Sequence, residues 1–258
     1  MGNYLEAEAA VKHALELDEN SAIAHAIYAE IMVDKGDFDG AAEESRLALE
    51  LDPNSLEAHR ARGYVLYWTS NYDLAIDEYQ AALAINNRIP NLHMMLGYTY
   101  AAIGEYDSSV ESFNQANALN PGDPTPDYEA SRVYFTIGEF AQAVQYAEQA
   151  VNDDPGNANL QGNLGVMYAK HDELNKAITH LTLSVQGGVT DNGVVVEGIP
   201  ISYKLRVIEV YSLYGLTLAR LNRCGEAIPV FQNMLATVAD NEVAVFNAEA
   251  GLEICQTG

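Results

Sequence analysis

Residues 90–123, PNLHMMLGYTYAAIGEYDSSVESFNQANALNPGD, hold the pattern that decides the fold. Gly97 in this stretch belongs to a series of small residues, each 34 positions from the next: Ala29, Gly63, Gly97, Ser131 and Gly165. Further series have the same period, one of small residues (Ala7, Ala41, Ala75, Ser109, Ala143, Ala177) and one of aromatic residues (Tyr4, Phe38, Tyr72, Tyr106, Phe140). A fixed period of this length predicts a repeat architecture.

Each repeat has the pattern of two amphipathic helices joined by a turn. In residues 58–69 and 72–85 the apolar side chains recur every three or four positions, and Ser70-Asn71 interrupts the pattern. The repeats end in segments such as Asp52-Pro53-Asn54-Ser55, where proline stops one helix and serine or asparagine caps the next. The sequence therefore predicts a chain of antiparallel helix pairs.

These residues resemble the tetratricopeptide repeat family. The family pattern is Trp, two residues, Leu-Gly, two residues, Tyr, then Ala, three residues, an aromatic residue, and finally Pro. Residues 90–123 show it as Leu96, Gly97, Tyr100, Phe113, Ala116 and Pro121, with His93 in the Trp position. The resemblance implies an all-α fold, a right-handed α-solenoid of antiparallel helix pairs (a superhelix). It also implies a concave groove lined by the first helix of each repeat, which binds a protein or peptide and carries out no catalysis.

The repeat boundaries predict a single solenoid domain over residues 1–258. Its parts are a half repeat (1–21), five repeats (22–55, 56–89, 90–123, 124–157, 158–191), an insertion (192–207), a repeat (208–241) and a capping helix (242–258). Gly2 occupies the inter-helix turn position and Tyr4 opens a second helix, so the first repeat lacks its first helix. We therefore expect the chain to be part of a longer array.

The insertion differs in character from the repeats. A turn sequence, Asp191-Asn192-Gly193, precedes the β-branched run Val194-Val195-Val196, which predicts a small β-hairpin. Two roles remain open, either a finger that contacts a partner or a cover over the last repeats.

The charge balance excludes several functions. Lys and Arg number 13 against 37 Asp and Glu, for a net charge of −24. Such a surface repels phosphate backbones and anionic lipids, so no nucleic acid is expected as a partner. No apolar stretch is long enough to insert into a membrane. The compartment stays unknown, because the absence of a targeting signal favours the cytoplasm whereas a disulfide would favour an extracytoplasmic location.

Histidines and cysteines allow alternative interpretations. His25, His59 and His93 recur every 34 residues, but helix packing separates equivalent positions by about 8–10 Å, too far for a shared metal. We interpret them as packing residues and expect no metal. Cys224 and Cys255 fall at the same end of a helix layer, where they form either a disulfide or two buried thiols.

No catalytic, phosphate-binding or dinucleotide motif occurs, so neither an enzyme nor a cofactor is predicted. The predicted groove carries residue types that are enriched at binding hot spots. They are Arg60, Tyr64, Tyr67, Trp68, Met94, Tyr98, Tyr128, Arg132 and Phe135. The two arginines would orient a carboxylate or a carbonyl of the ligand, although some of the set would instead pack between repeats. The Lys, Asn and Arg pattern of a carboxylate clamp is missing.

The predicted function is a non-enzymatic scaffold that binds an unidentified protein or peptide segment in the groove. Two alternatives belong to other classes. The chain is a regulatory or spacer segment of a larger enzyme or signalling protein, or it is a structural solenoid that self-associates end to end through an open amino-terminal face.

Overall fold

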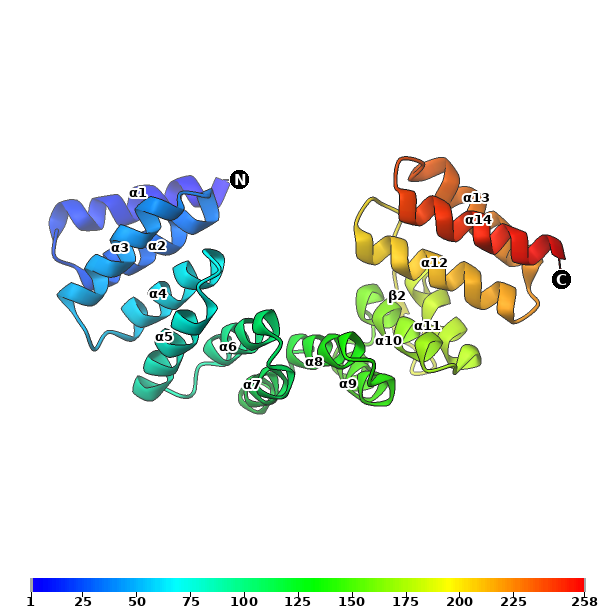
Figure 1. Cartoon of the computed structure of the whole chain (residues 1–258), viewed down its shortest axis with the longest axis horizontal. Coiled ribbons are helices and arrows are strands. Elements are labelled where there is room, and N and C mark those ends of the chain that lie inside the picture. The colour runs from blue at the N-terminus through cyan, green and yellow to red at the C-terminus, as the bar shows by residue number, and fades with distance from the viewer. Residues whose placement is uncertain (1, 258) are drawn as a thin grey trace. The chain divides into compact units, whose positions relative to one another are not determined.

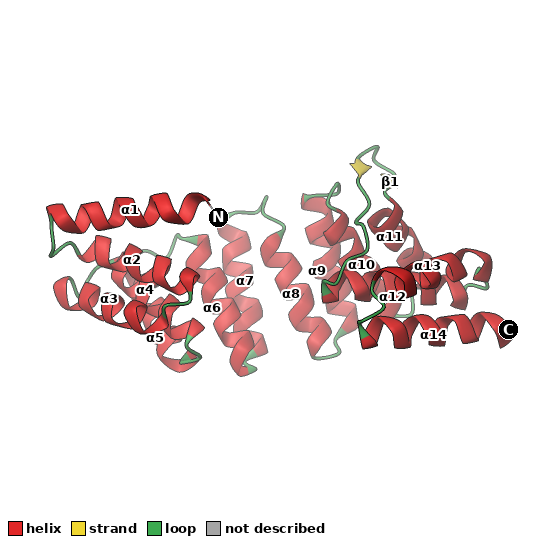
Figure 2. Ribbon diagram, turned by 90° about the horizontal axis from the view of Figure 1, so that it is seen from above, coloured by secondary structure: helices red, strands yellow, loops and turns green. Residues whose placement is uncertain are grey.

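The computed structural model describes residues 2–257, with side chains for residues 5–256. Two compact units, Met1–Pro121 (unit 1) and Gly122–Gly258 (unit 2), make up the fold. Each unit is a series of antiparallel helix pairs (Figures 1 and 2). The helices of unit 1 are α1 (Gly2–Leu17), α2 (Ala22–Lys35), α3 (Phe38–Leu51), α4 (Leu56–Trp68), α5 (Tyr72–Ile85), α6 (Pro90–Ile103) and α7 (Tyr106–Leu119). Unit 2 contains α8 (Thr125–Thr136), α9 (Phe140–Asp153), α10 (Ala158–Lys170), α11 (Leu174–Gln186), β1 (Gly188–Val189), β2 (Val195–Val196), α12 (Leu205–Arg220), α13 (Cys224–Thr237) and α14 (Glu242–Thr257).

This arrangement is the predicted all-α solenoid architecture with a small hairpin insertion. Two boundaries differ from the sequence expectation. Gly2, expected in a turn, begins α1, and the side chain of Tyr4 lies outside the described residues. Helix α12 begins at Leu205, three residues before the predicted repeat boundary at 208.

The turn between the two helices of a pair requires a left-handed residue at one fixed position. Gly36, Gly104 and Gly138 occupy it with φ of 82°, 81° and 82°. In other repeats Ser70, Asp172 and Asn222 take the position with φ of 61°, 67° and 59°. The turn geometry is therefore kept even where glycine, the residue that adopts it at least cost, is absent.

Each helix pair is held by a small residue facing a large one 16 positions later. A Cβ atom added at Gly63 would lie 2.7 Å from the Tyr79 ring, and one added at Gly97 would lie 2.5 Å from the Phe113 ring. Gly215 faces Phe231 in the same way, with 2.4 Å. The glycines thus let an aromatic ring reach the backbone of the first helix, which explains the 34-residue series of small residues.

The histidine series has a structural role at the junction between repeats. Nε2 of His25 and of His59 lies 2.9 and 3.0 Å from the backbone carbonyl six residues earlier, in the inter-repeat turn. Nδ1 of the same rings contacts Glu44 and Glu78 on the second helix, at 2.5 and 2.6 Å. Each ring therefore ties a turn to both helices of its repeat.

The insertion forms the predicted hairpin. Strands β1 and β2 pair antiparallel, with Gly188 opposite Val196 and Val189 opposite Val195. Val196 is buried, and the backbone N–H of Ile199 donates to the carbonyl of Ser184 on α11 at 2.8 Å. The Tyr211 hydroxyl of α12 donates to the Ile199 carbonyl, also at 2.8 Å. The segment thus packs on both neighbouring helices of unit 2.

Candidate functional site

Three consecutive first helices of unit 1 form a polar pocket of about 180 Å³. We call it the unit 1 pocket and define it by its lining residues. They are Glu30 and Asp34 on α2, Arg60 and Tyr64 on α4, Tyr79 on α5, and Asn91 and Met95 on α6. The pocket exists because the first helices of successive repeats pack side by side, which aligns one turn of each.

Charged side chains pair across the repeats in this pocket. Arg60 Nε lies 3.0 Å from Glu30 Oε1, and Arg60 Nη2 donates to Glu30 Oε2 at 3.1 Å. One turn further along, the Tyr64 hydroxyl donates to Asp34 Oδ1 at 2.9 Å. In each pair the two residues are 30 positions apart in the sequence, which is the 34-residue repeat minus one helical turn of about four residues.

Burial alters the titration of these groups. Burial raises the pKa of Glu30, the Arg60 charge opposes that rise, and the Asp34 charge adds to it. Burial and the hydrogen bond to Asp34 raise the pKa of Tyr64 to about 12. Because Tyr64 stays protonated at neutral pH, its hydroxyl remains a hydrogen-bond donor. The pocket also holds two carboxyl groups, Glu30 and Asp34, and one guanidinium, Arg60.

Tyr79 forms the floor of the pocket. Its side chain has no solvent exposure, and its hydroxyl oxygen has no hydrogen-bond partner among the described residues. Burial raises the pKa of this phenol, with the Glu30 charge as the next contribution, so the hydroxyl stays neutral. An unpaired buried hydroxyl costs about 1–3 kcal/mol, which makes it an unusual feature to find in a helix-pair core.

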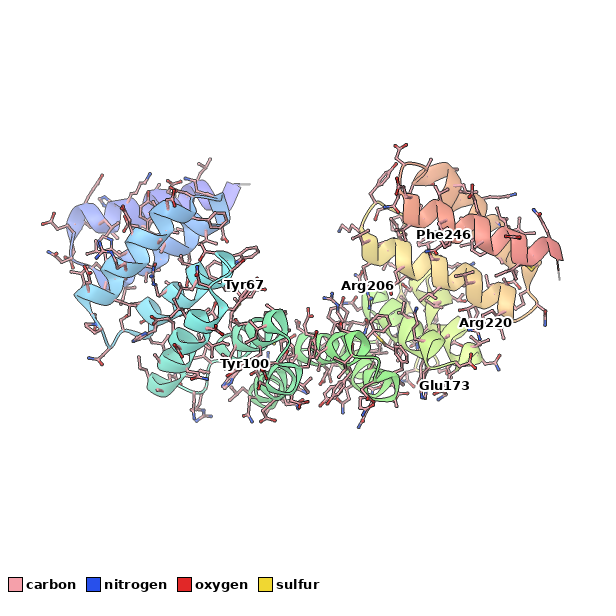
Figure 3. All side chains as sticks on the ribbon, in the orientation of Figure 1. Tyr67, Tyr100, Glu173, Arg206, Arg220 and Phe246 are labelled. Atoms are coloured by element: carbon pink, nitrogen blue, oxygen red, sulfur yellow. A yellow bond between two sulfur atoms is a disulfide. The ribbon has the colours of Figure 1, made fainter. Side chains whose placement is uncertain are left out.

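The predicted residues of unit 1 divide into two groups. Arg60 and Tyr64 line the pocket, and Trp68, which is 52% exposed, packs edge-on against Tyr64 with ring centroids 6.2 Å apart. Tyr67 also packs edge-on against Trp68, at 5.8 Å; Figure 3 labels it on α4. Trp68 thus lies next to a lining residue of the pocket, whereas Tyr67 also packs against the apolar core of unit 1.

The α6 residues of the prediction lie elsewhere. The Tyr98 ring packs edge-on against Phe113 at 5.4 Å, so it belongs in part to the helix-pair core. Met94 is half-buried, and its neighbour Met95 lines the pocket in its place.

The predicted residues of unit 2 form a separate cluster on α8. The Arg132 guanidinium lies 5.7 Å above the Tyr128 ring and its Nη1 is 3.3 Å from Glu129. Tyr128 and Phe135 both pack against the core of unit 2.

The first helices at the other end of unit 2 enclose a pocket of about 430 Å³ that the sequence did not single out. Its walls are mostly apolar. They are formed by residues of α10, α12 and α14: Lys170, Leu205, Ile208, Glu209, Ser212, Leu213, Leu216, Val243 and Asn247. Beside it, Arg206 donates to Asn163 and lies 2.6 Å from Glu209, and Phe246, labelled in Figure 3, is largely exposed.

A third pocket, of about 520 Å³, lies between α9, α11 and the hairpin. His180 lines it with Nδ1 2.7 Å from Gln161 Oε1, and the Gln161 amide donates to the Pro155 carbonyl at 2.8 Å. Because the Gln161 oxygen can only accept, His180 Nδ1 donates to it. Burial lowers the pKa of His180, which favours the neutral ring.

Cys224 and Cys255 form a disulfide in the structure, with Cα atoms 5.4 Å apart. The bond joins the start of α13 to the end of α14. Helix α14 covers Phe231, since a Cβ atom added at Gly251 would lie 2.1 Å from that ring. The two cysteines thus fasten the last helix to the core of unit 2.

Within residues 2–257, no group of three His, Cys, Asp or Glu side chains is placed to hold a metal ion. In the same range no helix has both the length and the apolar character needed to cross a bilayer.

Comparison with known proteins identifies the repeat and the fold. The family profile described as "Tetratricopeptide repeat" matches residues 1–55, 33–88, 60–124 and 128–187. No curated protein matches the chain.

Among solved structures, PilF of Pseudomonas aeruginosa superposes with a TM-score of 0.68 at 18% identity, covering 90% of this chain and 98% of PilF. YrrB, described as a tetratricopeptide repeat protein with an unusual peptide-binding site, superposes with a TM-score of 0.53 at 24% identity, covering 67% of this chain and 89% of YrrB. A chain of the Cut9-Hcn1 structure superposes with a TM-score of 0.68 at 16% identity, covering 97% of this chain and 46% of that chain. At these identities the likeness concerns the fold.

Proposed function

We propose that this chain, which belongs to the tetratricopeptide repeat family, is a non-enzymatic scaffold. It binds a peptide segment of a protein partner at the unit 1 pocket. One observation carries this proposal. Side chains from three consecutive repeats converge on one pocket that holds charged groups, hydroxyls and an amide. A solenoid core has no need for such a cluster, whereas a peptide needs both hydrogen-bonding groups and apolar surface.

The aromatic residues beside the pocket support peptide binding. Trp68 is half exposed and is held between Tyr64 and Tyr67 by edge-on contacts. Tryptophan and tyrosine side chains lose little conformational entropy on binding and bury a large area, so they serve as anchors. YrrB, which shares the fold, is described as having a peptide-binding site.

We keep the predicted residues of unit 2 as a separate contact surface. Arg132, half exposed above Tyr128, offers guanidinium donors to a carbonyl or carboxylate of the partner. Phe135, three residues further along α8, is partly buried and packs against the core of unit 2. Each unit would then contact the partner independently.

The test is a selection of random twelve-residue peptides displayed on phage, with the full chain as the immobilised target. Peptides that bind are synthesised and their affinity is measured by calorimetry for the wild type and for the double variant Tyr64→Ala/Trp68→Ala. We expect affinity to fall at least about tenfold, since two hot-spot side chains are removed.

The matched control is Leu74→Ala/Ile85→Ala, which removes two exposed apolar side chains, 55% and 48% exposed, from α5 of the same repeat. It should bind like the wild type. Equal loss in both double variants, or no loss in either, would reject the pocket as the binding site.

Self-association remains a second candidate because apolar side chains are exposed at one end of unit 1. Leu5 on α1 is 74% exposed, and Ile23 and Ile27 on α2 are 52% and 40% exposed. Sedimentation velocity over a wide concentration range tests it. A monomer at every concentration would exclude this candidate.

A further inference from the structure

We propose that the unit 1 pocket selects a lysine or arginine side chain, so that the partner segment is a peptide with a basic residue at its centre. This inference deepens the proposed function and rests on it. It is carried by the charge of the pocket, by the unpaired hydroxyl in its floor and by its size.

The charges of the pocket favour a cation. Glu30 and Asp34 supply two negative charges and Arg60 supplies one positive charge. Arg60 forms an ion pair with Glu30, so its charge is already compensated, although only its Nη2 makes a hydrogen bond and its Nε has no hydrogen-bond partner among the described residues. Asp34 accepts from the neutral Tyr64 hydroxyl and has no cationic partner among the described residues. A bound ammonium or guanidinium group would balance the remaining negative charge, whereas a carboxylate or phosphate would meet two carboxylates.

The Tyr79 hydroxyl points to a polar ligand atom. Phe113 and Phe231 occupy the equivalent position of other repeats and pack against Gly97 and Gly215 as Tyr79 packs against Gly63. Packing therefore needs only the ring, and the hydroxyl adds a polar atom that nothing in the described chain satisfies. An N–H of a cationic side chain would donate to this oxygen and remove the cost of its burial.

The size of the pocket fits one side chain. Its volume is about 180 Å³. It is smaller than the roughly 300–1,000 Å³ of pockets that hold drug-sized ligands. Met95 and the Tyr64 ring give the walls apolar surface, which suits the methylene stem of lysine or arginine.

The experiment uses the full chain and the peptides selected on phage as described above. Each basic residue of a selected peptide is replaced in turn by norleucine, which keeps the stem and removes the charge. We expect the selected pool to be enriched in lysine and arginine, and one replacement to weaken binding at least about tenfold, as for loss of a hydrogen bond to a charged group.

Protein variants complete a double-mutant cycle. Asp34→Asn should weaken the lysine or arginine peptide at least about tenfold and leave its norleucine form unchanged, because it removes the charge that has no cationic partner and keeps an oxygen that accepts from Tyr64. The control Glu43→Gln removes the same charge from an exposed position of α3 and should leave both peptides unchanged. Tyr79→Phe should weaken the basic peptide about three- to tenfold while the melting temperature stays equal or rises, because the unpaired hydroxyl is gone. A purely structural Tyr79 would not show that combination.

The outcomes separate the two proposals. If no peptide binds, or if binding ignores Tyr64→Ala/Trp68→Ala, the proposed function fails and this inference falls with it. If peptides bind at the pocket without enrichment of basic residues, or if Asp34→Asn acts equally on the basic and norleucine peptides, the proposed function stands and the cationic pocket is refuted.

Discussion

Opening the Cys224–Cys255 bond should loosen the end of unit 2 and leave unit 1 untouched. The cysteines are 31 positions apart. A cross-link that closes a loop of that length restricts the unfolded chain by about 12 cal/mol/K, or about 3.7 kcal/mol at 25 °C. That free energy corresponds to about a 500-fold change in the equilibrium for an opening that unfolds the segment between the cysteines.

The effect should be local because repeat arrays open in parts. Helix α14 packs on α12 and α13 and covers Phe231, so its amides report the opening directly. The assay is hydrogen exchange followed by mass spectrometry on the oxidised protein and on the variant Cys224→Ser/Cys255→Ser. Peptides from α13 and α14 should exchange about two to three orders of magnitude faster in the variant.

Amides of α4 and α5 in unit 1 serve as the internal control and should exchange at the same rate in both proteins. An acceleration of less than about tenfold at α14 would show that packing alone holds this helix. An equal acceleration in both units would show that the array does not open locally. Either result would refute the reasoning.

Three further predictions concern stability, measured by urea denaturation. Gly97→Ala should destabilise by about 1–3 kcal/mol, because the new Cβ would lie 2.5 Å from the Phe113 ring; an unchanged midpoint would contradict the packing argument. Gly104→Ala should lower the free energy of unfolding by about 1 kcal/mol or more, although no atom lies within 4 Å of the new Cβ, because the position has a left-handed backbone. Ser70→Gly, at φ 61°, should raise the free energy of unfolding by about 1 kcal/mol for the same reason. A shift of the same sign in both variants would argue against a left-handed requirement. Burial lowers the pKa of His180 below 6.5, so the unfolded chain binds more protons than the folded chain as the pH falls below 6.5. The stability that is present above pH 6.5 should therefore be lost as the pH falls through the folded pKa. His180→Gln should flatten this dependence, and parallel pH profiles of the two proteins would count against it.

The sequence allowed the repeat to be predicted because its period is imposed by packing. The small residues at 63 and 97 are required by the rings of Tyr79 and Phe113, and the left-handed turn accounts for Gly36 and Gly104. Ser70 occupies the same turn position with a left-handed backbone, so glycine does not mark this position in every repeat of the sequence although the turn geometry is continuous.

The binding site was harder to predict because its contacts cross between repeats. Arg60 and Tyr64 were chosen as groove residues, but their partners Glu30 and Asp34 lie 30 residues earlier. A search for complementary residues at one repeat minus one helical turn would have found both pairs. The role of Tyr79 was not accessible, because the sequence shows an aromatic core position and only the structure shows its hydroxyl unpaired in the floor of a pocket.

Site-specific photocrosslinking tests the central claim, that a peptide binds at the unit 1 pocket, most directly. A photoreactive benzoylphenylalanine is placed at Trp68, beside the pocket, or at Leu74 on α5, two positions of similar exposure at 52% and 55%. A selected peptide should crosslink from position 68 and not from position 74. Crosslinking from position 74 alone, or from both positions equally, would contradict the account.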